Sequence, residues 1–216
     1  MPQRALDPTG VVLVDKPAGP SSFAVVRELR DRTGARAGHA GTLDPFATGL
    51  LIVLLGRATK LQPRFVGLDK RYRAQVELTA TSSTGDPEGE LTACEPPDRA
   101  ALEARLAALR GEVPLPVPAF SAVHVEGERA YRLARRGAVV AMPVRLARVH
   151  ALELVEFDGR LALLELHVGS GTYVRAIAEA LGGHCRELRR TAVGPFAVGE
   201  ADATRIVPLE QALARL

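Results

Sequence analysis

The chain has 216 residues, of which 47% are hydrophobic and 25% charged, and its formal net charge is +3. At this length one domain buries about 70% of its unfolded surface, enough for a core without disulfides or structural metals. The two cysteines form no CxxC pair, which argues against a secreted disulfide scaffold and a zinc ribbon. The N-terminus lacks the apolar region of a signal peptide, and the apolar run 50–55 is far shorter than a membrane span. We therefore expect a cytoplasmic protein.

Charge is unevenly distributed along the chain. Residues 57–73 hold six basic side chains and one acid, and residues 129–148 hold six arginines and no acid. Residues 77–103 hold seven acids and one arginine. Such segregation indicates a basic surface for a polyanion. Because 25 arginines beside 3 lysines also fit a bias of genome composition, charge alone leaves nucleic-acid binding open.

The N-terminal third predicts a strand, a helix and two further strands. Residues 11–14 form a short strand that ends in the turn signal DKPAG. Ser21 or Ser22 then begins a helix that ends at Gly34. The apolar run 50–55 predicts a fully buried strand, and residues 72–79 alternate as a strand buried on one face.

The middle of the chain is richer in turn residues. Residues 81–97 are polar, with glycine and proline, and predict a loop. Asp98 begins a helix that closes at Gly111. The following stretch VPLPVPAF has too many prolines for a helix or a central strand.

The last third predicts a hairpin and two helices. Residues 149–157 and 161–168 form strands joined through an Asp-Gly turn. Residues 172–181 and 209–216 form helices. Strands outnumber helices and several are adjacent in sequence, which predicts an α/β protein (α+β type) with a mixed, largely antiparallel sheet flanked by helices.

One residue in the stretch GHAGTLDPFATGLLIVLLG, residues 38–56, is hard to place. Asp44 lies in an uncharged run, is followed by Pro45, and precedes the buried strand. It either shapes a turn, since Asp-Pro commonly initiates one, or is a working carboxylate fixed beside the core.

The stretch GSGTYVRAIAEALG, residues 169–182, follows a strand and opens a helix, as a phosphate-binding turn does. GxGxxG fails because Val174 is in its sixth position, and no GxxxxGK[ST] exists, so no nucleotide cofactor is expected. Arg175 falls on the helix's first turn, where the dipole disfavours a cation. A carboxylate partner would offset this, and Asp44 is the candidate.

Other chemistry is not indicated. The five histidines, at positions 39, 124, 150, 167 and 184, have no metal-ligand spacing, so no metal site is expected. No GxSxG is present, and neither cysteine lies in a hydrolase signature, so a nucleophilic Ser or Cys is not predicted.

Together these motifs match a family. GHAGTLDPFATGLL, with VVLVDKPAGPSS before it and KRYRAQVEL, PAFSAVHVEGERAYRLARRG, GSGTYVRAIAEALG and LRRTAVGPF after it, closely resembles the TruB family of tRNA pseudouridine synthases. The resemblance runs in order from residue 10 to about residue 197.

The resemblance implies a pseudouridine synthase fold and an enzyme that isomerises uridine 55 in the T loop of tRNA, without cofactor or metal. It implies one catalytic domain over residues 1–216, with an RNA-binding insertion at about 112–148 that covers the T-arm stem. The small C-terminal RNA-binding domain of most relatives is expected to be absent.

The resemblance also implies the catalytic residues. Asp44 is the nucleophile, which attacks either the uracil ring or the sugar C1′. Arg175 is its ion-pair partner, and Tyr72 stacks on the target base and handles a proton. Lys16 is expected to support the pocket structurally.

Three further residues are implied to bind the RNA. His39 fills the gap left by the extruded nucleotide, Tyr173 lines the pocket, and Leu188 touches the base. The segment ALGGHCREL, residues 180–188, is several residues shorter than the usual family segment, which makes the assignment of Leu188 depend on the alignment there.

Two other functions compete with the enzyme. A tRNA-binding or folding module with secondary catalysis need not keep Asp44, Tyr72, Tyr173 and Arg175 together. A guide-RNA-dependent synthase needs protein-docking segments that 216 residues do not accommodate. We therefore expect tRNA as the partner, with no membrane and no obligatory protein partner.

Overall fold

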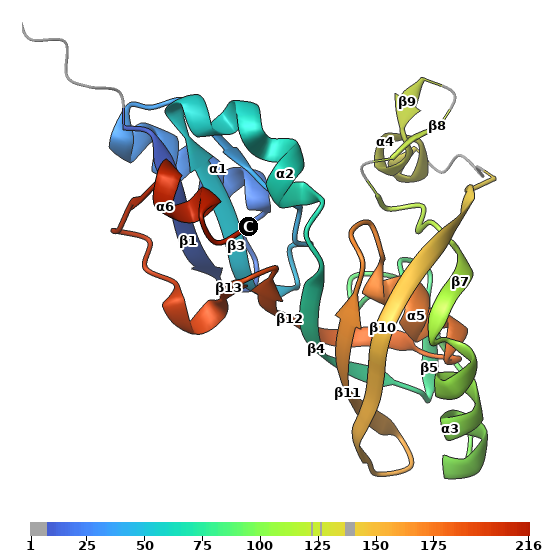
Figure 1. Ribbon diagram of the computed structural model, residues 1–216. Coiled ribbons are helices and arrows are strands. Elements are labelled where there is room, and N and C mark those ends of the chain that lie inside the picture. The colour runs from blue at the N-terminus through green and yellow to red at the C-terminus, as the bar shows by residue number, and fades with distance from the viewer. Residues whose placement is uncertain (1–7, 122, 126, 137–140) are drawn as a thin grey trace, which may run out of the picture. The chain divides into compact units, whose positions relative to one another are not determined.

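The structure, a computed structural model, describes residues 8–121, 123–125, 127–136 and 141–216 (Figure 1). The chain divides into two compact units: unit 1 comprises Met1–Tyr72 and Arg189–Leu216, and unit 2 comprises Arg73–Leu188. The chain passes from one unit to the other in strands β4 (Lys70–Glu77) and β12 (His184–Val193). The single catalytic domain with an insertion stays a prediction.

Unit 1 is built on a sheet in which β3 (Thr48–Leu55) is central. The order is β14 (Val207–Pro208), β1 (Gly10–Lys16), β3 and β12, with β2 (Ala37–His39) on β3 and β13 (Phe196–Ala197) on β12. β1–β3 and β2–β3 are antiparallel, whereas β3 and β12 pair in parallel. Every residue of β3 after Thr48 is buried, which confirms the predicted buried strand.

Helices cover this sheet. α1 (Ser22–Thr33) packs on β2 and β3. The hydroxyl of Ser21 accepts a hydrogen bond from Ala24 N at its start, and Gly34 ends it with φ of 69°. The predicted caps are therefore confirmed. The remaining short helices of the unit are η1 (Gly56–Leu61), α2 (Gln62–Val66), η2 (Val198–Glu200) and α6 (Leu209–Leu213), of which α6 packs on β1 (Figure 1).

Unit 2 is built on a second sheet region. β10 (Val144–Phe157) pairs antiparallel with β11 (Leu161–Val168) and with the edge strand β7 (Gly111–Pro116). The first of these pairs is the predicted hairpin, although β10 begins five residues earlier than expected. β7 contains Pro114 and Pro116, which an edge strand accommodates and a central strand does not.

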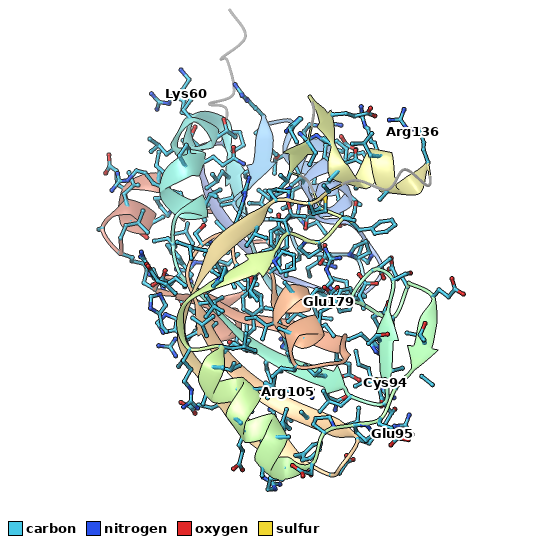
Figure 2. The ribbon with its side chains drawn as sticks, turned by 90° about the vertical axis from the view of Figure 1, so that its right-hand side faces the viewer. Lys60, Cys94, Glu95, Arg105, Arg136 and Glu179 are labelled. Atoms are coloured by element: carbon cyan, nitrogen blue, oxygen red, sulfur yellow. The ribbon has the colours of Figure 1, made fainter. Side chains whose placement is uncertain are left out.

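Two helices of unit 2 are tied to each other. α3 (Arg99–Ala108) begins at Asp98, whose side chain accepts from Ala101 N at 2.7 Å, and it lies along β10 (Figure 1). Arg105 of α3 donates from Nη1 to Leu181 O, at the end of α5 (Val174–Ala180), at 2.7 Å (Figure 2). The predicted helices are confirmed, with slightly shorter bounds.

The structure corrects the sequence prediction at two places and describes part of the expected insertion. The segment expected to be a loop, residues 81–97, contributes to a small hairpin, β5 (Ala80–Ser82) with β6 (Leu91–Ala93). β12 was not predicted, because its outward residues are charged and mask its alternation. The expected insertion contains β8 (His124–Val125), β9 (Glu128–Arg129) and α4 (Ala130–Arg135), whereas residues 122, 126 and 137–140 lie outside the described residues.

In the parts of the chain that the structure describes, no helix is both long and apolar enough to cross a membrane.

Candidate active site

Asp44 lies in the segment of residues 41–50, which comprises a loop and the first residues of β3 and which we call the Asp44 loop. Side chains from other elements hold the main chain on both sides of it. Ser22, the first residue of α1, accepts from Leu43 N and donates to Leu43 O, each at 2.8 Å. Lys16, at the end of β1, donates from Nζ to Pro45 O at 3.2 Å. The half-buried Asp44 is thus held at both neighbouring residues.

Arg190 of β12 holds both ends of the same loop. Its guanidinium donates from Nε to Leu50 O at 2.7 Å, from Nη2 to Gly41 O at 3.0 Å and from Nη1 to Thr42 O at 3.4 Å. Gly49 has φ of +103°, and a Cβ there would lie 2.2 Å from Arg190 O. Only glycine therefore permits the close approach of β3 and β12 at this point.

Three buried cations in unit 1 interact electrostatically. Burial lowers the pKa of Lys16, the charge of Asp44 opposes this shift, and the charge of Arg190 adds to it. Burial, with help from Arg190 and against the charge of Asp69, lowers the pKa of Lys70 to about 8. Lys70 donates to the main-chain carbonyls of residues 66 and 68, both at 2.5 Å. The attraction between Asp44 and Lys16 is mutual, so it also favours the ionised carboxylate.

Tyr72 is buried, with 9% of its surface exposed. It lies on β4, where Lys70 and Tyr72 point to the buried face and Arg71 and Arg73 to the exposed face. This confirms the alternation predicted for the strand, and it places Arg71 and Arg73 on the face of β4 opposite to Tyr72.

His39 is the last residue of β2 and is half-buried. Burial and, secondly, the charge of Arg190 lower its pKa, so its imidazole is neutral at pH 7. Among the described residues, buried atom Nδ1 of His39 has no hydrogen-bond partner. A buried polar atom without a partner can form a hydrogen bond with a bound ligand.

Arg175 of α5 lies in unit 2 and is 2% exposed. It donates from Nη1 to Thr84 O and from Nη2 to Phe120 O, each at 2.8 Å. Its Nη1 also lies 3.6 Å from Oδ2 of Asp86, a carboxylate of which 8% of the side chain is exposed. Because Asp44 belongs to unit 1, its pairing with Arg175 stays a prediction.

Asp86 is a residue that the sequence analysis missed. It accepts hydrogen bonds from Thr84 Oγ1 at 2.6 Å and from Glu88 N at 3.1 Å. The signal was available: Asp86 precedes a proline, as Asp44 does, and follows a run of small residues, TSSTG. Arg175 therefore has a carboxylate beside it within unit 2, and its pairing with Asp44 stays a prediction.

Glu179 of α5 lies beside the loop that carries Asp86 (Figure 2). Burial raises the pKa of Glu179, Arg175 opposes this and Asp86 adds to it. A Cβ at Gly85, which has φ of +73°, would lie 2.3 Å from Glu179 Oε1. Glycine at this position thus lets the Asp86 loop approach α5.

The other two predicted RNA contacts also lie in unit 2. Tyr173 is half-buried and precedes the first residue of α5. Leu188 lies on β12 with 8% of its surface exposed. In unit 1 the structure brings Asp44, Lys16 and Arg190 together, and in unit 2 it brings Arg175 and Asp86 together.

Comparison with known proteins identifies this set of motifs. Residues 28–174 match the family model described as TruB family pseudouridylate synthase (N terminal domain). The tRNA pseudouridine synthase B of Corynebacterium jeikeium (strain K411) is 43% identical over 218 residues, which cover 91% of this chain and 70% of that protein. That of Cereibacter sphaeroides (strain ATCC 17025 / ATH 2.4.3) is 48% identical over 198 residues, covering 87% and 66%.

The chain belongs to the TruB family of pseudouridylate synthases. It is therefore an isomerase, as the motifs predicted. A solved Cbf5-Nop10-Gar1 complex contains a similar chain, with 29% identity and a TM-score of 0.67 over 87% of this chain and 50% of that one. A solved pseudouridylate synthase, 15% identical with a TM-score of 0.51, shares the fold. The predicted fold class is confirmed.

Proposed function

We propose that this TruB family member converts uridine 55 in the T loop of tRNA into pseudouridine, with Asp44 as the nucleophile. The relatives named tRNA pseudouridine synthase B support tRNA as the substrate. The observation that carries the proposal is the Asp44 loop, in which Ser22, Lys16 and Arg190 fix the main chain around one half-buried carboxylate.

The reaction is an isomerisation that neither gains nor loses an atom. The bond between sugar C1′ and uracil N1 breaks, a bond from C1′ to C5 forms, C5 loses its proton, and N1 gains one. A nucleophilic carboxylate can attack either C1′ or the uracil ring, and it must be ionised and held close to the base. The cations of unit 1 and the hydrogen-bonded loop support both requirements for Asp44.

The base must leave the stack before Asp44 can reach it, at a cost of a few kcal/mol. We propose that Tyr72 stacks on the extruded base and handles a proton, and that His39 occupies the gap in the RNA. The neutral imidazole of His39 and its unpartnered Nδ1 support a hydrogen bond to the RNA.

The other site residues that the family resemblance implies belong to unit 2. We propose that Tyr173 and Leu188 line the pocket and that Arg175 pairs with Asp44. The guanidinium of Arg175 is held by two carbonyls and by Asp86, which supports a fixed direction for its charge. A cation on the first turn of a helix is otherwise unfavourable.

Exposed basic residues would bind the phosphates. In residues 57–73 the exposed cations are Arg57, Lys60, Arg64, Arg71 and Arg73. In the insertion the pattern is weaker than the sequence indicates, because Arg136 is paired with Glu128 and Arg148 with Glu112. We propose that these surfaces contact the T-arm, without a cofactor or an obligatory protein partner, in the cytoplasm where tRNA is modified.

A short T-arm hairpin with tritium at C5 of uridine 55 tests the proposal. Purified protein should release one equivalent of tritium and leave pseudouridine at position 55. The same hairpin labelled at a stem uridine should release none. Folded protein that releases no tritium from uridine 55, or releases it equally from the stem, would contradict the proposed substrate.

A further inference from the structure

Arg190 is a buried arginine to which the motif analysis gave no role. It is 1% exposed, and its three side-chain hydrogen bonds all end on the main chain of the Asp44 loop. Burying a guanidinium carries a desolvation cost, and an apolar side chain of similar volume often gives equal stability. The arginine therefore points to a role in the reaction rather than in the core.

We propose that Arg190 is a positioning residue for Asp44, which fixes the loop from inside unit 1 and supplies positive charge that favours the ionised carboxylate. This inference rests on the proposed function, because it gives Arg190 an effect only through the nucleophile.

The geometry of the loop explains why it needs this residue. Gly41 and Gly49, on either side of Asp44, have φ of +98° and +103°. Glycine is conformationally permissive, so on its own it leaves such positions free to move. The planar fork of Arg190 reaches the carbonyls of residues 41, 42 and 50 from three separate nitrogens, whereas a lysine at this position would place all its donors on one nitrogen. A displacement of about 1 Å at a reacting group can lower a rate about 100-fold.

The charge of Arg190 also acts on neighbouring side chains of unit 1. It contributes to lowering the pKa of Lys16, of Lys70 and of His39. The neutral His39 adds no charge at pH 7, so among the described residues of unit 1 the buried cations near the loop are Lys16, Lys70 and Arg190. The partly exposed Arg189 also reaches the loop, at the hydroxyl of Thr48, but it is paired with Asp15. The hydrogen-bond partners of Arg190 are neutral carbonyls, which do not neutralise its positive charge. This charge therefore favours the ionised form of the Asp44 carboxylate.

The test is the single-turnover rate of tritium release as a function of pH, for Arg190→Lys and Arg190→Gln. We expect both to lower the rate at the pH optimum about 100-fold, with the dissociation constant for RNA changed less than about threefold. Arg190→Gln should also move the acid limb of the profile to higher pH, because the carboxylate ionises less readily. Arg190→Lys, which keeps the charge, should move the limb less.

Arg189 is the matched control. It precedes Arg190 on β12, but its side chain is 42% exposed and pairs with the exposed Asp15 at 2.6 Å. It reaches the Asp44 loop at the hydroxyl of Thr48, at 3.5 Å, and not at the carbonyls that Arg190 holds. Arg189→Gln should leave both the rate and the acid limb unchanged. If Arg190→Lys folds and keeps the wild-type rate and limb while Asp44→Asn is inactive, the inference is wrong and the proposed function stands. If Asp44→Asn is active, the proposed function itself is wrong.

A second measurement decides the matter should the Arg190 variants not fold. Nitrogen-15 spectra of the wild type should show separate, slowly exchanging Nη signals for Arg190. These signals should titrate with the midpoint of the acid limb, and Asp44→Asn should abolish that titration. Averaged Nη signals, or a titration that survives in Asp44→Asn, would overturn the inference.

Discussion

The buried cations beside the Asp44 loop in unit 1 and the buried Arg175 in unit 2 differ in the groups that they contact. In unit 1 the side-chain hydrogen bonds of Lys16 and Arg190 end on neutral carbonyls. In unit 2 the cation Arg175 meets a carboxylate, Asp86, as well as two carbonyls.

The difference bears on how Asp44 stays ionised. Carbonyl dipoles solvate a cation without cancelling its charge, so Lys16 and Arg190 can still attract Asp44. Arg175 already forms an ion pair with Asp86, so a pairing with Asp44 would place two carboxylates beside one guanidinium. The cations of unit 1 are therefore expected to contribute to Asp44 beyond the partner that the family resemblance implies.

The largest effect should follow from removing the carboxylate itself. Asp44→Asn keeps the size of the side chain and the turn but removes the nucleophile. We expect the single-turnover rate to fall by at least about 10⁴-fold, with RNA affinity retained. Asp15→Asn, which neutralises an exposed carboxylate of the same unit, is the control and should react at the wild-type rate. Turnover by purified Asp44→Asn above contamination would contradict the assignment.

Arg175→Met should have the next largest effect. It leaves Asp86 buried without its cation, which costs about 3–5 kcal/mol of unfolding free energy for a fully buried pair. It also removes the proposed partner of Asp44, so we expect the single-turnover rate to fall about 100-fold or more. Arg175→Lys should be milder, because it keeps the charge but loses the fork.

Asp86→Asn separates the two roles of Arg175. It removes the carboxylate but leaves the cation and its carbonyl partners, so the rate should fall less than in Arg175→Met. A thermal melt must first show that each variant is folded. A folded Arg175→Met variant with a near-normal rate would mean that unit 2 adds no charge to the nucleophile.

The burial of Lys70 in unit 1 should make the free energy of unfolding depend on pH. The pKa of Lys70 falls from 10.5 to about 8 on folding, so between these values the folded state binds fewer protons than the unfolded state. The stability penalty is full below pH 8 and is lost as pH rises toward 10.5. Relative to Lys70→Met, the unfolding free energy of the wild type should rise by up to about 3 kcal/mol over this window.

Urea unfolding of both proteins at several pH values measures this difference. Taking the difference removes the contributions of the other groups that titrate in the same range. A difference that stays constant from pH 8 to 10.5 would show that the pKa of Lys70 is not lowered.

The exposed arginines should give the smallest effect. Arg132→Gln with Arg136→Gln should weaken RNA binding only a few-fold, and the slope of log affinity against log salt should fall by at most about 2. Arg99→Gln, in the acidic part of unit 2, is the control and should leave the slope unchanged. An unchanged slope in the double variant would remove this surface from the proposed interface.

Much of the fold could be predicted because local signals decide it. The caps of α1, the Asp-Gly hairpin and the apolar run of β3 each depend on nearby residues. β12 was missed because its exposed Arg186 and Glu187 interrupt the alternation, and its burial depends on neighbours distant in sequence. The small β5–β6 hairpin was missed because its residues are mostly exposed and polar.

Part of the candidate site could also be predicted from the sequence. Asp44 could be singled out from one carboxylate in an uncharged run, and the family resemblance supplied the rest. The carbonyl contacts of Lys16 and Arg190 could not be predicted, because main-chain acceptors carry no sequence signal. Asp86 could have been found from the Asp-Pro pair that it shares with Asp44.

Mapping pseudouridine in the tRNA of cells that lack the gene tests the central claim most directly. Position 55 should be unmodified without the gene, fully modified when the wild-type gene is restored, and unmodified when the restored gene encodes Asp44→Asn. The other pseudouridines of the same tRNAs serve as the internal control and should not change. Pseudouridine at position 55 in cells without the gene, or its return with Asp44→Asn, would contradict the account.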